Sequence, residues 1–459
     1  SVYFVGIGGI GMSALARYFH SKGITVSGYD KTETALTKEL VKEGITVGYK
    51  DDITSIPPNV DLVVYTPAIK ENAAVDYYKT KGINVVKRSD VLQAVSAKSF
   101  NICVAGTHGK TTISTMIAHI LRHSGYGCNA FLGGVSSNYG TNFWASKNEV
   151  SVIEADEYDR SFLKLSPDIA IITAMDADHL DIYGNEASMQ QAFIDFGNKI
   201  KEGGLLLSKF GLKRIKEIKA GKKLSYSLGN DAADVFASNI KIEEGGYRFD
   251  VQLKNTSITN LELKVGGMHN IENIVAAITV ANELQIDAEK IWQAVLDFKG
   301  VKRRFEYIIP LKEQQPGGYT YPVFIDDYAH HPEELKMLLK SARTLFPQRK
   351  VTVIFQPHLF SRTKDFKNEF ASSLALADAI LLLPIYPARE VPIEGVTSKL
   401  IWDKIDAKEK KLVTKEELMD WAKEKIVTMD KEFGEVIITA GAGDIDALVQ
   451  PLKEIFQQA

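Results

Sequence analysis

Seven residues near position 106 carry the most specific chemistry of the chain, in the run Gly106-Thr107-His108-Gly109-Lys110-Thr111-Thr112. The apolar run 102–105 before it is typical of a buried strand, and the run 113–121 after it has apolar residues at helical spacing. A glycine loop between a strand and a helix turns backbone N–H groups toward an anion. Lys110 would add a positive charge and Thr111 a hydroxyl ligand for Mg²⁺, so we expect the run to hold the phosphates of a nucleotide.

This glycine loop is shorter than the common P-loop, in which the first glycine would fall at Val104. The alternative is an ordinary glycine turn before a helix. The Lys-Thr-Thr run that follows the turn directly argues against that alternative, and the loop therefore predicts an ATP site.

A second glycine-rich run opens the chain, where Gly6, Gly8 and Gly11 satisfy the pattern G-x-G-x-x-G between an expected strand and an expected helix over 14–20. This pattern admits a pyrophosphate, and an acidic residue about 20 positions later takes a ribose hydroxyl. NAD and other nucleotide diphosphates both present a pyrophosphate, so the ligand stays open, and a plain glycine turn is the alternative. The residues expected to bind this ligand are Gly6, Gly8, Gly9, Gly11, Asp30 and Thr66.

Acidic residues and a histidine follow two expected strands of the second segment. Glu154 ends the apolar run 150–154, and His179 follows the run 169–173, which places both at the sheet edge of Lys110. Mg²⁺ prefers carboxylate oxygens, so we expect Glu154 to bind it. His179 is a softer ligand that could bind the metal, a phosphate or a neighbouring acid. The acids that compete for the metal are Asp156, Glu157, Asp176 and Asp178, some of which could simply be solvated.

Polar clusters follow three expected strands in the last third of the chain. The strands are expected at 323–325, 351–355 and 436–439, and the clusters at 326–332, 356–362 and 441–444. Open parallel sheets bind ligands at the carboxyl ends of their strands, so the three clusters indicate one crevice. Tyr328 lies in it; His330 and His358 could position an amine or take a proton, and Arg362 could stabilise developing charge. Each of these side chains could equally have a structural role.

Length and composition set the frame for these motifs. A chain of 459 residues suggests about three domains, and a net charge of −3 argues against a nucleic-acid surface. The two cysteines, Cys103 and Cys128, have neither a disulfide framework nor metal-ligand spacing, and Cys103 is expected in the core. No apolar stretch approaches the roughly 20 residues that span a bilayer. We therefore expect a soluble, cytoplasmic protein that binds neither nucleic acid nor membrane.

The pattern of runs predicts an α/β protein of three domains. We expect a Rossmann-like domain over 1–97, a central P-loop domain with a parallel or mixed sheet over 98–300, and a Rossmann-like domain over 301–459. The alternating stretch 234–265 predicts an antiparallel hairpin, and a long helix is expected over 271–284. Along the chain, the expected ATP site lies between a nucleotide diphosphate site and a polar crevice. This arrangement suits activation of a carboxylate as an acyl phosphate. An amine then attacks to form an amide.

At this point the chain resembles the Mur ligases nearly from end to end, and most of all their alanine-adding branch. The motifs that carry the resemblance are Gly6-Ile7-Gly8-Gly9-Ile10-Gly11-Met12-Ser13, Gly106 to Thr112, Glu154-Ala155-Asp156-Glu157, Asp178-His179-Leu180-Asp181, His269-Asn270, Arg303-Arg304-Phe305, Asp327-Tyr328-Ala329-His330-His331-Pro332 and Gln356-Pro357-His358. The resemblance implies that ATP, UDP-N-acetylmuramate and L-alanine react to the amide, ADP and phosphate, a cytoplasmic step of peptidoglycan synthesis.

The resemblance also assigns roles by position. Lys110 and Thr111 would meet phosphate and Mg²⁺, and Glu154 and His179 would serve the metal. Asn270 and Arg304 would lie at the nucleotide, and the alanine side would be lined by Tyr328, His330, His358 and Arg362. Three departures stand out: 180–198 lacks the lysine that some related ligases carbamylate, Tyr158 replaces a common Ser, and Leu359 replaces a frequent Arg.

Three other functions compete with this interpretation. The nearest is the recycling ligase that joins a whole tripeptide to the same UDP-sugar, and the form of the first glycine run, 6–13, favours the alanine enzyme. A nicotinamide-dependent dehydrogenase would leave Lys110, Thr111 and Thr112 without a role. A non-enzymatic nucleotide-binding regulator is disfavoured by the intact lysine, threonine and glutamate set. We expect a monomer or a weak homodimer.

Overall fold

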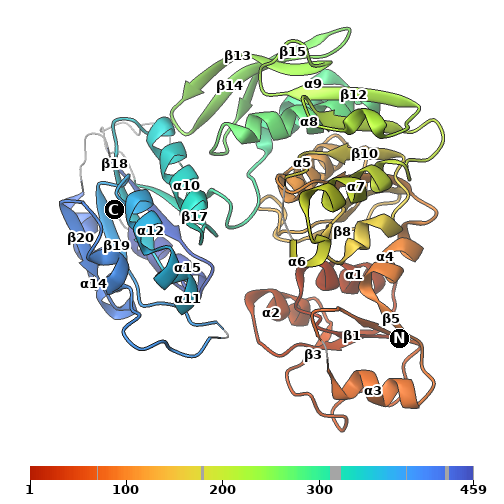
Figure 1. Cartoon of the computed structure of the whole chain (residues 1–459), viewed down its shortest axis with the longest axis horizontal. Helices are drawn as coiled ribbons and strands as arrows, with labels where there is room; N and C mark the ends of the chain where they lie inside the picture. The colour runs from red at the N-terminus through yellow and green to blue at the C-terminus, as the bar shows by residue number, and fades with distance from the viewer. Residues whose placement is uncertain (70, 177–179, 311–321, 389, 430–433, 458–459) are drawn as a thin grey trace. The chain divides into compact units, whose positions relative to one another are not determined.

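A computed structural model describes residues 1–459 except 70, 177–179, 311–321, 389, 430–433 and 458–459 (Figure 1). The chain forms two compact units. The first comprises Ser1–Ser238, Asp250–Thr259 and Glu272–Asp297, and the second Asn239–Phe249, Asn260–Ile271 and Phe298–Ala459. No helix among the described residues is long and apolar enough to cross a membrane.

The first unit begins with a parallel sheet in the order β3-β2-β1-β4-β5. Its strands are β1 (Val2–Val5), β2 (Val26–Tyr29), β3 (Thr46–Gly48), β4 (Leu62–Tyr65) and β5 (Val85–Lys87). The helices are α1 (Ile10–Ser21), α2 (Ala35–Lys42), α3 (Ala73–Thr80) and α4 (Arg88–Ser96). The strand order reverses between β1 and β4, so the glycine run after β1 lies at the point where such sheets bind ligands.

The central sheet of the same unit runs β12-β11-β10-β6-β9-β7-β8, parallel except for β8, and β12 also pairs with the start of β13. Its strands are β6 (Phe100–Ala105), β7 (Asn129–Phe131), β8 (Phe143–Trp144), β9 (Val150–Glu154), β10 (Ile169–Ile172), β11 (Leu205–Lys209) and β12 (Lys222–Ser227). The strand predicted before the glycine loop, at 102–105, is thus confirmed, and so are those predicted after it, at 150–154 and 169–173.

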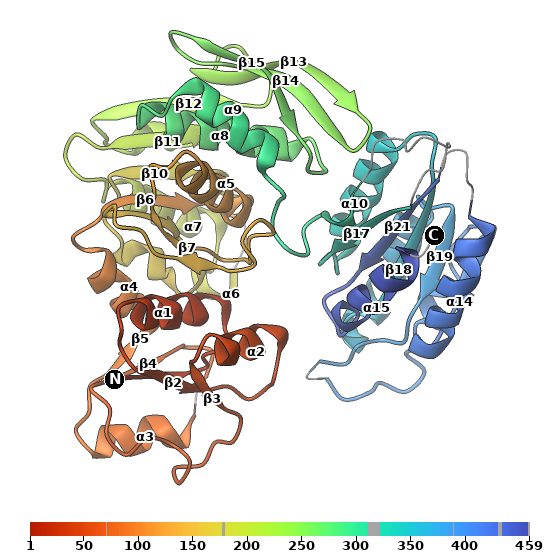
Figure 2. The ribbon, with the colours of Figure 1, turned by 180° about the vertical axis from the view of Figure 1, so that it is seen from behind.

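Helices cover both faces of this sheet, with α5 and α7 on opposite faces in the two views (Figures 1 and 2). The helices are α5 (Lys110–His123), α6 (Leu180–Tyr183), α7 (Glu186–Gly197), α8 (His269–Glu283) and α9 (Ala288–Asp297), with short 3-10 segments at Tyr158–Lys164 and Ile215–Glu217. The predicted hairpin is a run of three strands, β13 (Val235–Glu243), β14 (Gly246–Gln252) and β15 (Ser257–Leu263).

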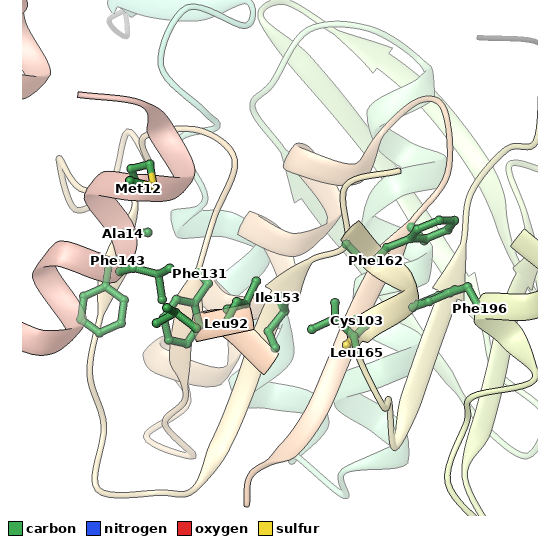
Figure 3. Packing of buried hydrophobic residues seen from close by; sticks show 14 of the residues in the cluster. Met12, Ala14, Leu92, Cys103, Phe131, Phe143, Ile153, Phe162, Leu165 and Phe196 are labelled. Atoms are coloured by element: carbon green, nitrogen blue, oxygen red, sulfur yellow. The ribbon is translucent and has the colours of Figure 1, made fainter. Parts of the chain in front are cut away.

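One apolar cluster joins the first sheet of this unit to the central one. Met12 and Ala14 of α1 belong to the same cluster as Phe131 and Phe143 of β7 and β8 (Figure 3). The cluster continues to Cys103, which is fully buried as predicted. The glycine run that begins α1 is therefore fixed against the domain that carries the P-loop.

The second unit contains a sheet in the order β16-β17-β21-β18-β19-β20, parallel except for β16. Its strands are β16 (Glu306–Ile309), β17 (Val323–Asp327), β18 (Lys350–Phe355), β19 (Ala379–Leu382), β20 (Glu409–Leu412) and β21 (Glu435–Ala440). The helices are α10 (Pro332–Leu345), α11 (Phe360–Asp365), α12 (Lys367–Leu374), α13 (Lys399–Trp402), α14 (Lys415–Thr428) and α15 (Asp446–Phe456). The predicted parallel sheet is confirmed, with one antiparallel edge strand.

Candidate functional site

The glycine loop connects β6 to α5, and both of its glycines are required by geometry. Gly106 has a φ of +132°, and a Cβ there would lie 2.1 Å from Thr173 Oγ1. Gly109 precedes α5 with a φ of +80°, a backbone conformation that residues with a side chain rarely adopt. A Cβ there would lie 3.0 Å from Asn273 Oδ1. The loop thus keeps its backbone open at the start of a helix, the arrangement that receives phosphates.

Two oxygen atoms of the protein accept hydrogen bonds from the Lys110 ammonium. Its Nζ donates to the carbonyl of Gly106 at 2.8 Å and to Glu157 Oε1 at 2.7 Å. The Glu157 side chain is only 1% exposed, and burial raises its pKa although Lys110 opposes that change. Sequence reasoning treated Glu157 as a competitor for the metal, whereas the structure pairs it with the lysine.

Thr111 and Glu154 bring two oxygens together at the start of α5. Thr111 Oγ1 donates to Glu154 Oε1 at 3.0 Å, and the Gly133 amide donates to Glu154 Oε2 at 2.9 Å. A hydroxyl and a carboxylate next to a phosphate loop are ligands that Mg²⁺ prefers. Both residues were predicted as ligands, and they are the part of the predicted metal set that the structure places together. Gly133 was not predicted.

Other atoms of the loop also fit a phosphate ligand. Thr107 is buried, and its Oγ1 has no hydrogen-bond partner among the described residues. His108 is exposed, with Nε2 3.8 Å from Asp176 Oδ2, and Thr112 lies in the first turn of α5. An unpartnered hydroxyl beside a glycine cradle is what a nucleotide phosphate would satisfy. His179 and Asp178 lie outside the described residues.

A cavity of about 350 Å³ in the first unit is lined by the glycine run that begins α1 and by residues at and after the ends of β7 and β9. Its lining includes Gly9, Gly11 and Thr66 of the predicted substrate site together with Glu154. Gly6, Gly8 and Asp30 are not among the described residues that line it. Asp30 instead accepts a hydrogen bond from the Gly8 amide at 2.8 Å, and a Cβ at Gly6 would meet Thr66 at 2.9 Å. Gly6, Gly8 and Asp30 therefore shape the first part of the loop, and the cavity is lined by its later part, from Gly9 onward.

The second unit gathers the predicted crevice residues at the carboxyl ends of β17 and β18. The His330 and His358 rings lie 5.8 Å apart, and His358 stacks on Tyr386. Tyr328 is exposed and its ring is 5.0 Å from that of His330. Burial, helped by His330 and Arg362, lowers the pKa of His358, so its ring is neutral near pH 7. The rings of the two strand ends thus lie close together, and their common role as a ligand site stays a prediction.

Two buried nitrogen atoms of this crevice lack partners. His358 Nδ1 and Arg362 Nη1 have no hydrogen-bond partner among the described residues. Gln356 connects the neighbouring strand end, since its Nε2 donates to Asp444 Oδ1 at 2.8 Å. Leu359, which departs from the family pattern, adopts a φ of +69° immediately before α11. The unpartnered Nη1 donor of Arg362 fits an anionic group such as a carboxylate.

Asp327 is a residue of this end that sequence reasoning did not select. It accepts hydrogen bonds from the amides of Phe305 and Ala329, both at 2.7 Å, and burial raises its pKa to about 6. Arg304 is exposed and close enough to oppose that rise in pKa. Asn270 donates to the Gly266 carbonyl at 2.6 Å. The role of Asn270 and Arg304 at the nucleotide stays a prediction.

Asn273, also missed, lies against the glycine loop in the first unit. It is buried, and its Oδ1 is the atom that limits the space at Gly109. The signal in the sequence is the spacing of Asn270 and Asn273, which places both on one face of α8.

Comparisons with known proteins cover the whole chain. The family model described as Mur ligase family, catalytic domain, matches residues 1–100. The Mur ligase middle domain matches residues 104–281, and the Mur ligase, glutamate ligase domain, matches residues 303–443. The three-domain α/β fold is thereby established, and the boundaries at 97/98 and 300/301 stay predictions.

Similar proteins extend over the same length. The UDP-N-acetylmuramate–L-alanine ligase of Cytophaga hutchinsonii is 45% identical, covering 100% of this chain and 97% of its own. That of Flavobacterium psychrophilum is 46% identical, with 99% and 97% covered.

Solved structures show the same fold. The UDP-N-acetylmuramate-alanine ligase of Thermotoga maritima is 29% identical with a TM-score of 0.81, and covers 100% of this chain and 99% of its own. A murein peptide ligase of Psychrobacter arcticus is 23% identical, with a TM-score of 0.64 over 100% and 99%. From end to end, this chain belongs to the Mur ligase family.

Proposed function

We propose that this chain joins L-alanine to the lactyl carboxylate of UDP-N-acetylmuramate in an ATP-dependent reaction that yields ADP and phosphate. Full-length relatives at about 45% identity carry the name of that ligase, which favours it over the tripeptide-recycling ligase. The observation that carries the proposal is that Glu154, which accepts a hydrogen bond from Thr111 next to Lys110, lines the same cavity as the first glycine run. A dehydrogenase would need no such set.

Mg²⁺ fits the oxygen pair of this site. Thr111 Oγ1 and Glu154 would hold the ion, and His179 is a further predicted ligand. When bound, Mg²⁺ neutralises charge on the transferring phosphoryl group. Lys110 would exchange Glu157 for a phosphate oxygen, and Thr107 Oγ1 and the loop amides would orient the same phosphate.

The chemistry then requires two displacements. A carboxylate oxygen of the sugar attacks the terminal phosphorus of ATP, the bond from that phosphorus to ADP breaks, and an acyl phosphate forms. The amine of alanine attacks the acyl carbon, and phosphate leaves with the electron pair of the broken C–O bond. The amine must lose a proton, and the neutral ring of His358, next to His330, can accept it. Arg362 would bind the alanine carboxylate.

Phosphate release tests the proposal directly. With ATP and Mg²⁺ present, we expect release to require both UDP-N-acetylmuramate and L-alanine. Lys110→Ala should lower kcat at least 100-fold, because the developing phosphoryl charge loses its cation. Lys213→Ala, at an exposed lysine of the same unit, is the matched control and should keep the wild-type rate.

Three results would contradict the proposal. Release at the same rate without the sugar would exclude sugar activation, and a preference for the tripeptide over L-alanine would assign the recycling reaction. Binding of NADH without phosphate release would assign the dehydrogenase. The three substrates of the proposed reaction, ATP, UDP-N-acetylmuramate and L-alanine, are highly polar, which fits the cytoplasmic location expected from the sequence. The monomer or weak homodimer stays a prediction.

A further inference from the structure

The side chain of Arg88 lies against Gly11 of the first glycine run, in space that a side chain at position 11 would fill. Arg88 is the first residue of α4, and a Cβ on Gly11 would lie 2.8 Å from Arg88 Nη1 and 3.3 Å from its Cζ. Gly11 does not have a positive φ, so glycine is required there for space and not for backbone conformation. The third glycine of the pattern therefore makes room for a guanidinium group.

The same arginine lines the cavity that reaches Glu154. The cavity volume of about 350 Å³ falls in the range of roughly 300–1,000 Å³ that small-molecule sites have. Arg88 is the single basic residue among the described residues that line it. Three carboxylates, Glu154, Asp156 and Asp159, line it as well. An anionic substrate in this cavity would meet three like charges and one opposite charge.

Arg88 is not neutralised by the protein. It makes no hydrogen bond or ion pair with any residue that the structure describes. The nearby acid on the same helix, Asp90, is already paired with Lys164. Glu154 is occupied by Thr111 and the Gly133 amide. A guanidinium group that packs against a glycine and has no carboxylate partner among the described residues is suited to bind an oxyanion in a bidentate manner.

From this placement we infer that Arg88 binds an oxyanion of the UDP-sugar, either a diphosphate oxygen or the lactyl carboxylate, and so contributes to recognition of that substrate. The inference rests on the proposed function. Both groups present the planar or forked oxygen pairs that an arginine fork matches and a lysine does not. Arg88 is thereby a substrate-binding residue that the glycine pattern alone does not reveal.

Binding measurements on three nucleotides test the inference. UDP and UDP-N-acetylglucosamine carry the diphosphate without the lactyl carboxylate, and UDP-N-acetylmuramate carries both. For Arg88→Met we expect the Kd of UDP-N-acetylmuramate to rise at least 10-fold while the KM of ATP changes less than 2-fold. Arg88→Lys should recover only part of the loss. Lys87→Met, which removes the adjacent exposed charge, is the matched control and should bind like the wild type.

The outcomes distinguish the two oxyanions and the two proposals. Equal weakening of all three nucleotides assigns the diphosphate, and weakening of UDP-N-acetylmuramate alone assigns the carboxylate; both support the inference. An unchanged Kd for all three, with wild-type thermal unfolding, overturns it. If the wild-type protein itself fails to bind UDP-N-acetylmuramate, the proposed function fails first and independently of Arg88.

Discussion

Lys110 is held in place by the protein itself, through a buried ion pair with Glu157. Among the residues that the structure describes, Glu157→Ala would leave the Lys110 ammonium with the Gly106 carbonyl alone, and breaking a buried pair costs about 3 kcal/mol. We expect the free energy of unfolding to fall by about that amount in urea without nucleotide. Glu217→Ala, which breaks an exposed pair with Arg214, should leave the urea midpoint unchanged. Equal effects of the two substitutions would show that burial of the ion pair adds nothing to the free energy of unfolding.

His119 gives a pH-dependent prediction. Tyr139 donates to its Nδ1 at 3.0 Å, and its Nε2 donates to the Ala294 carbonyl at 2.8 Å, so the folded state holds the neutral ring. Burial lowers its pKa from 6.5 to about 4. Because the unfolded chain takes up this proton below pH 6.5 and the folded one only near pH 4, stability falls as pH drops through that window.

The measurement compares urea unfolding of the wild type and His119→Gln at pH 7 and pH 4.5. The wild type should lose about 2 to 3 kcal/mol more than the variant on acidification, since the other titrating groups are common to both. A loss of the same size in both proteins would show that His119 does not couple folding to pH in this range.

Residue types at the site could be predicted, and their partners could not. Lys110, Thr111 and Glu154 follow from the positions of strand ends and the glycine loop. The pairing of Glu157 with Lys110 depends on the backbone that follows Glu154, where Asp159 and Arg160 adopt φ values of 57° and 53°. Such conformations are uncommon for residues other than glycine and leave no periodic signal in a sequence.

At the scale of elements, the loop between β7 and β8 positions the carboxylate of Glu154. Gly133 lies in this loop, and a Cβ there would lie 2.2 Å from Glu154 Oε2 although its φ is not positive. Gly133→Ala should therefore displace the carboxylate from Thr111. We expect the Mg²⁺ concentration for half-maximal phosphate release to rise at least 10-fold.

A matched glycine controls for this substitution. Gly229 also lacks a positive φ, and a Cβ there would meet only the Ala237 carbonyl at 3.8 Å. Gly229→Ala should leave the Mg²⁺ dependence as in the wild type. If Gly133→Ala does the same, the contact between Gly133 and Glu154 has no bearing on metal binding.

The elements that sequence patterns predicted are those with long apolar runs. β9 (150–154) begins and ends where predicted, because four of its five residues are buried. Strands at edges were missed: β3 has exposed ends, and β20 reads Glu-Lys-Lys-Leu. An edge strand needs no apolar face, so neighbouring strands and not its own residues determine it.

At the scale of the whole chain, three predicted segments fold as two compact units. Three family models also match the chain in succession, over residues 1–100, 104–281 and 303–443, and the exact segment boundaries stay predictions. The first two segments merge because Tyr18 of α1 lies 6.0 Å from the ring of Phe143 on β8 and 5.7 Å from that of Phe131 on β7. Helical periodicity predicts that α1 has an apolar face, but not which sheet covers it.

This shared core predicts that the two sheets of the first unit unfold together. Phe143→Ala removes a buried ring that packs on Tyr18 and Phe131, and such a truncation costs about 3 to 5 kcal/mol. Hydrogen exchange should show equal loss of protection at the amides of β1 and β6. This is expected although Phe143 belongs to the sheet of β6 and not to that of β1. Phe370→Ala, which removes a fully buried ring in the second unit, should leave both strands protected. If β6 loses protection while β1 keeps it, the N-terminal sheet is an independent folding unit, and the cluster in Figure 3 is a contact between two domains and not one core.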